Sequence, residues 1–175
     1  MATAIYCIAN SHDMADRIVT SLRGSGVVRE QDISVLFPDK KGTKEFAHEH
    51  NTKAPEGAIA GAGAGGVTGG VLGLLAGIGA LAIPGVGPLI AAGPIMAALS
   101  GAAVGAAVGG VAGGLIGMGM PEFEAKRYED KVKGGNILMS AHSENSENTK
   151  TIKEIFKAAG AEHISTTSEK SDKPK

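Results

Sequence analysis

The chain has 175 residues, a formal net charge of −1 at pH 7 and a single cysteine, Cys7. A near-neutral charge and an aromatic content of 3% provide neither a basic footprint nor stacking platforms, which excludes a typical nucleic-acid-binding domain. One cysteine excludes an intrachain disulfide, and its apolar neighbours predict a buried, unreactive thiol. Polar residues 10–13 follow the first apolar run too soon for a signal peptide, so we expect both charged flanks in the cytoplasm.

The two charged flanks predict the same order of elements. The first flank, residues 1–39, predicts a strand over 2–9, then a helix, then a strand over 32–37. The helix begins at a cap formed by Asn10 or Ser11 and ends at Gly24 and Gly26. The second flank, residues 136–167, predicts a strand over 136–141, a helix over 143–159 and a strand over 163–167. Two such units in tandem, βαββαβ, predict a ferredoxin-like fold of the α+β class.

Residues 57–120 separate the two units and contain no charged side chain. Glycine recurs there at every fourth position in two blocks: Gly57, Gly61, Gly65, Gly69, Gly73 and Gly77, then Gly101, Gly105, Gly109, Gly113 and Gly117. Each glycine costs an isolated helix in water about 1 kcal/mol relative to alanine. In an apolar environment the same residues let two helices approach closely. The pattern therefore predicts a glycine-zipper helical hairpin that packs against helices.

A proline-glycine link joins the two blocks and predicts the hairpin turn, formed by Pro84, Gly85, Gly87, Pro88 and Pro94. Each arm of about 24 residues would make a helix of about 36 Å, enough for a bilayer core of about 30 Å. Lysines flank both arms, which predicts an inner-membrane protein with both termini in the cytoplasm. The turn lacks polar side chains, which does not fit a loop exposed at the membrane surface. Two alternatives to membrane insertion therefore remain: a cytoplasmic assembly whose hairpins bury one another, and a silk-like β stack over 61–65.

The remaining segments connect these units. Residues 40–56 are polar and predict a linker, as a loop or a short helix. Residues 121–135 predict a connecting helix, because Pro121 and acidic residues begin it and lysines and glycines end it. Residues 168–175 are charged and predict a disordered tail.

No motif predicts catalysis or a cofactor. Residues 61–66 match G-x-G-x-x-G, but no strand precedes them, so we expect no nucleotide. His48 and His50 have no third metal ligand nearby in the sequence and predict a solvated loop. His12 and His142 follow strands that we expect to be central and parallel, which would bring them to one sheet edge, in loops near helix starts or as a pH-sensitive site. We expect no enzyme activity and no small-molecule substrate.

The proline-glycine link and the run from Gly119-Met120-Pro121-Glu122 through Tyr128-Glu129 to Gly134-Gly135 carry a family resemblance. With the two flanks and the Gly/Ala insert, the chain resembles bacterial general-stress or heat- and low-temperature-induced proteins that have a glycine-zipper region. The resemblance implies a stress-associated membrane protein and no catalytic residues. We expect a non-enzymatic homo-oligomer that contacts a lipid bilayer; a soluble structural or regulatory module and a pore-forming subunit are the alternatives.

Overall fold

The computed structural model describes residues 3–38, 79–83, 87–95, 99 and 103–168. The predicted linker at 40–56, the first glycine block and residues 169–175 of the predicted tail lie outside this part. The elements are β1 (Thr3–Ala9), α1 (His12–Ser25), the short 3-10 turn η1 (Glu30–Asp32), β2 (Ile33–Pro38), β3 (Gly79–Ile83), β4 (Gly87–Ala92), α5 (Ala103–Gly117), α6 (Glu122–Lys133), β5 (Ile137–Ser143), α7 (Ser146–Ala158) and β6 (Glu162–Ser168).

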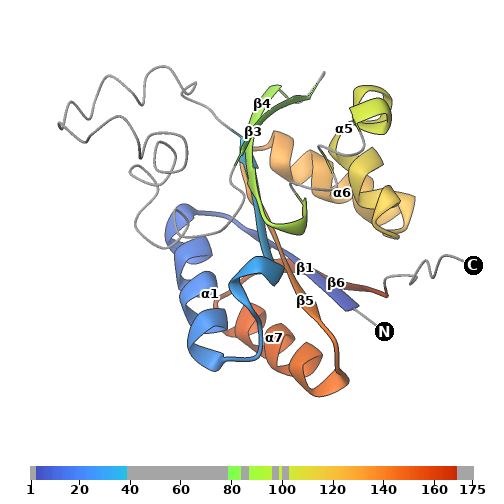
Figure 1. Ribbon diagram of the computed structural model, residues 1–175. Coiled ribbons are helices and arrows are strands. Elements are labelled where there is room, and N and C mark those ends of the chain that lie inside the picture. Colours follow the sequence, from blue (N-terminus) through green and yellow to red (C-terminus); the bar gives the residue numbers. More distant parts are fainter. Residues whose placement is uncertain (1–2, 39–78, 84–86, 96–98, 100–102, 169–175) are drawn as a thin grey trace, which may run out of the picture.

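One antiparallel sheet of six strands, in the order β3-β4-β2-β5-β1-β6, forms the centre of the molecule. Helices α1 and α7 cover one face, and α5 and α6 cover the other (Figure 1). The predicted α+β class is confirmed. Side chains alternate between the faces along each strand, so that Ile5 and Cys7 of β1 belong to the α1–α7 core and Ala4, Tyr6 and Ile8 to the α5–α6 core.

Local sequence signals explain the helices on the α1–α7 face. Helix α1 begins where predicted, because the Ser11 side chain accepts a hydrogen bond from Met14 N at 3.2 Å, and it ends at Gly26 with a left-handed φ of 66°. Helix α7 begins later than predicted. Ser143 still belongs to β5, and the helix cap is Asn145, whose side chain accepts from Asn148 N at 2.7 Å.

The prediction of helix and irregular turn for the middle of the glycine-rich stretch is wrong for residues 79–83 and 87–92. These residues form the strands β3 and β4, which pair with each other, and β4 also pairs with β2 from Val35↔Ala92 to Pro38↔Leu89. The predicted turn residues Gly87 and Pro88 therefore lie inside β4, while Pro84 and Gly85 are outside the described residues. The sheet edge at β2 supplies backbone partners that an isolated apolar segment lacks, so pairing overrides the helical period.

Gly93 lets the chain cross from β4 to the second face of the sheet. Its φ is 78°, and a Cβ at this position would overlap the Ile33 carbonyl group of β2. Pro94 follows, and Ile95 N then donates a buried hydrogen bond to Ser34 Oγ at 3.2 Å. Ile95 and Leu99 consequently reach the core under α5 and α6.

Candidate self-association surface

Helix α5 contains a break that the four-residue glycine period did not predict. Gly110 has φ 61° and ψ −153°, a region of backbone conformation that only glycine adopts readily, and helical turns lie on both sides of it. The expected continuous second arm is therefore wrong over Ala103–Gly117. Within the part of the chain that the structure describes, no helix combines the length and apolar character needed to cross a membrane.

A carboxylate from α6 caps the helix that restarts after the break. Ala112 N donates a hydrogen bond of 2.7 Å to Glu129 Oε2. The other oxygen, Glu129 Oε1, accepts from Lys133 Nζ at 2.6 Å. A negative side chain at a helix N-terminus satisfies a backbone donor and interacts favourably with the helix dipole, so α6 stabilises the second half of α5.

The inner side of this second half packs on the sheet. Val111 and Leu115 are fully buried, with Ala112 beside them. Gly114 also faces inward, and a Cβ there would overlap Leu99 Cδ2. Gly114, which makes this close contact, lies one position outside the predicted row.

The outer side of the same half is apolar and exposed. Gly113 is half-buried, and Ile116 is 42% exposed. Gly117 is exposed, and a methyl group added to its Cα would lie more than 4 Å from the surrounding described residues. Phe123, at the start of α6, is 71% exposed, and the Arg127 guanidinium lies 4.7 Å from its ring centre. We call Gly113, Ile116, Gly117 and Phe123 the outer apolar surface.

The structure describes only part of the predicted zipper row. Gly113 and Gly117 belong to the outer apolar surface, and Gly105 and Gly109 lie in the first half of α5, before the break. The other predicted positions are outside the described residues: Gly57, Gly61, Gly65, Gly69, Gly73, Gly77 and Gly101.

Tyr128 ties the α5–α6 layer to the sheet, a role that its sequence position did not reveal. Its hydroxyl group donates to the His163 carbonyl oxygen in β6 and shares a 2.9 Å hydrogen bond with Ser165 Oγ. The ring is 1% exposed, and burial raises the pKa of Tyr128 to about 12. Burial also raises the pKa of the Cys7 thiol, in agreement with an unreactive cysteine.

The expected meeting of His12 and His142 does not occur, because β1 and β5 are antiparallel rather than parallel. His12 follows the end of β1. Its ring is nearly perpendicular to the Phe37 ring, and the two ring centres are 5.1 Å apart. His142 lies opposite Ala4, near the beginning of β1, with its Nδ1 3.4 Å from the Asp32 carbonyl oxygen. No group of three or more metal-ligating side chains occurs among the described residues, and His48 and His50 are outside them.

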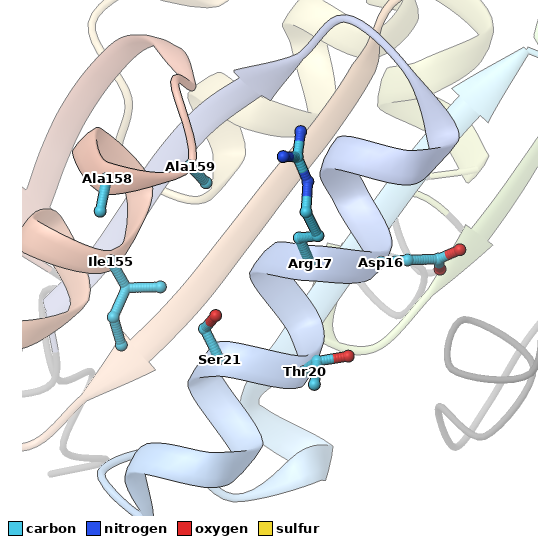
Figure 2. Close-up of a pocket in the computed structure, with 7 residues that line it drawn as sticks. All are labelled: Asp16, Arg17, Thr20, Ser21, Ile155, Ala158 and Ala159. Carbon is cyan, nitrogen blue, oxygen red and sulfur yellow. The ribbon is translucent and has the colours of Figure 1, made fainter.

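A hollow of about 440 Å³ lies between α1 and α7 (Figure 2). Asp16, Arg17 and Ser21 line it from α1, and Ile155 and Ala158 line it from α7. The hollow lies on the side of the sheet opposite the outer apolar surface, and its polar groups all come from one helix.

Comparison with known proteins adds no relative: no protein-family model, curated protein or solved structure matches the chain. The inference of its function therefore rests on the geometry of the molecule.

Proposed function

We propose that this is a non-enzymatic protein that self-associates through the outer apolar surface of α5 and α6. The observation that carries the proposal is the exposure of Ile116 and Gly117 on a helix whose opposite side already fills the core. An exposed apolar surface on a folded domain is typical of an interaction site.

A second copy of the chain fits this surface by its chemistry. The α5 part carries no charge, and its glycines allow the backbone of another helix to approach closely, so that packing contacts form along the row. The same surface on a second copy has the same properties, as a two-fold symmetric dimer requires. Phe123 provides an aromatic side chain of the kind that anchors interfaces.

The finer fold, location and biological context belong to the same proposal. The spatial order β6-β1-β5-β2, with α1 and α7 on one face, supports a ferredoxin-like unit to which β3 and β4 add two strands. The uncharged sequence of the first glycine block, residues 57–77, supports attachment to the inner membrane, and the family resemblance supports a role in stress. A membrane-attached protein pellets with membranes and is released by detergent, whereas a cytoplasmic assembly stays in the supernatant.

Two glycines allow a matched test of self-association. Gly117 in α5 and Gly24 in α1 are both exposed helical residues with open space around them. Both Gly117→Leu and Gly24→Leu should fold, because each new side chain extends into that open space. We expect Gly117→Leu to reduce the oligomer mass in sedimentation velocity and Gly24→Leu to leave it unchanged. Equal masses for both variants and the unmodified protein would refute the proposal.

A further inference from the structure

We propose that Glu129 holds α5 in its broken form and thereby restrains self-association. The inference rests on the proposed function, since it concerns how the same surface is regulated. The break divides the glycine row into Gly105 and Gly109 on one side and Gly113 and Gly117 on the other. Each half alone offers a partner helix only two glycines.

A continuous α5 would restore the whole row. Residues four apart advance by about 400° around a helix, so successive glycines shift by only about 40° and stay on one side. A crossing helix follows such a shift. The change requires a helical conformation at Gly110 and a backbone partner for the amide groups that follow it.

The Glu129 carboxylate stabilises the broken form through two contacts. In a continuous helix, Ala112 N would donate to the carbonyl group four residues earlier; here it donates to Glu129 Oε2 at 2.7 Å instead. Lys133 Nζ holds the other oxygen at 2.6 Å, which fixes the direction of the carboxylate. The Glu129 side chain is only 15% exposed, so little water competes for these bonds.

The conformation of Gly110 and the position of Glu129 depend on each other. A Cβ at residue 110 would lie 2.6 Å from Glu129 Oε2, so any other residue would push the carboxylate away from Ala112 N. The same residue has the φ of 61° that side chains disfavour. Glu129 and Gly110 thus form an autoinhibitory contact that splits the glycine row, and its loss would favour one continuous helix.

The test compares Gly110→Ala and Glu129→Ala with Glu122→Ala. Glu122 is a matched control, because it lies on the same helix and also pairs with a lysine four residues later, at 2.6 Å, yet its side chain is 67% exposed. Spin labels at positions 103 and 117, in a Cys7→Ala background, report the length of α5. A continuous helix places these backbone positions about 21 Å apart, and a bend at Gly110 would bring them closer together. Association is measured on the same variants without labels, because a label at position 117 would occupy the outer apolar surface.

We expect Gly110→Ala and Glu129→Ala to lengthen the label distance toward that limit. We also expect both to lower the concentration for half-maximal association about tenfold, the ratio that corresponds to one capping contact. Glu122→Ala should change neither. If Gly110→Ala does not fold, Glu129→Ala decides alone, since it removes the acceptor of Ala112 N and leaves residue 110 unchanged.

Two results would overturn the inference. One is an unchanged label distance in Glu129→Ala. The other is a longer distance without tighter association, because the contact would then control the shape of α5 alone. Failure of the proposed function is recognised separately, by unchanged oligomer mass in Gly117→Leu relative to Gly24→Leu.

Discussion

The helical layers on the two faces of the sheet are stabilised in different ways. In the α1–α7 layer, each helix is capped by a residue of its own segment, Ser11 or Asn145. In the α5–α6 layer, α5 breaks at Gly110, and Glu129 of α6 provides the cap for its second half. The first layer is specified by local sequence, whereas the second depends on contacts between segments. This dependence is what allows the second layer to exist in two forms.

The largest expected effects come from truncating one core residue in each layer. Phe156 of α7 and Leu115 of α5 are both fully buried. Phe156→Ala should lower the free energy of unfolding by about 3–5 kcal/mol and Leu115→Ala by about 2–5 kcal/mol, because each leaves a cavity. Urea denaturation measures both. A Leu115→Ala protein whose main transition is unshifted would show that α5 and α6 unfold separately from the sheet.

Alkaline pH should weaken the bond between the α5–α6 layer and the sheet. The unfolded chain releases the Tyr128 proton near pH 10, whereas the folded protein keeps it to about pH 12 because burial raises the pKa. The contribution of Tyr128 to the free energy of unfolding is therefore complete below pH 10. It falls by about 1.4 kcal/mol per pH unit between pH 10 and pH 12.

Tyr128→Phe removes this titration and separates it from other groups. At neutral pH the variant should be less stable by about 1–3 kcal/mol, because the His163 carbonyl oxygen loses the Tyr128 donor. The difference from the unmodified protein should shrink between pH 10 and pH 12. Urea titrations at several pH values measure it, and a constant difference would contradict the assigned cause.

The caps of the α1–α7 layer should have smaller, local effects. Ser11→Ala and Asn145→Ala should each lower the free energy of unfolding by about 1 kcal/mol, since each leaves one backbone donor without its side-chain acceptor. Ser146→Ala, at the exposed first position of α7, is the control and should be close to neutral. Thermal unfolding provides the measurement, and an effect of Ser146→Ala equal to that of Asn145→Ala would argue against capping.

The smallest effect is expected on the exposed side of α6. Glu122 and Lys126 form an ion pair with both side chains about two-thirds exposed. Hydrogen bonding and charge lower the pKa of Glu122 and raise that of Lys126, but solvent screens the pair. Lys126→Gln should leave the melting temperature unchanged within error, and a clear loss would give this surface a structural role that we do not assign to it.

The success of sequence-based prediction follows the same division between layers. Polar caps, glycine stops and apolar periodicity specified α1 and α7, because these signals act within a few residues. Helix α6 of the second layer was also predicted, from Pro121, the acidic residues at its start and the glycines at its end. The strands β3 and β4 and the break at Gly110 depend on partners distant in the sequence, the β2 edge and Glu129. The glycine at every fourth residue predicted helices that pack closely, but the period does not distinguish Gly113 on the outer side from Gly114 on the inner side.

Site-specific disulfide formation tests self-association through α5 most directly. In a Cys7→Ala background, Gly117→Cys and Gly24→Cys each place one exposed thiol, on the α5–α6 layer and on the α1–α7 layer respectively. A disulfide requires two Cα atoms within about 7 Å, so covalent dimers report close contact between copies. We expect dimers with Gly117→Cys and none above background with Gly24→Cys. Equal yields from the two positions, or dimers from Gly24→Cys alone, would contradict self-association through the outer apolar surface.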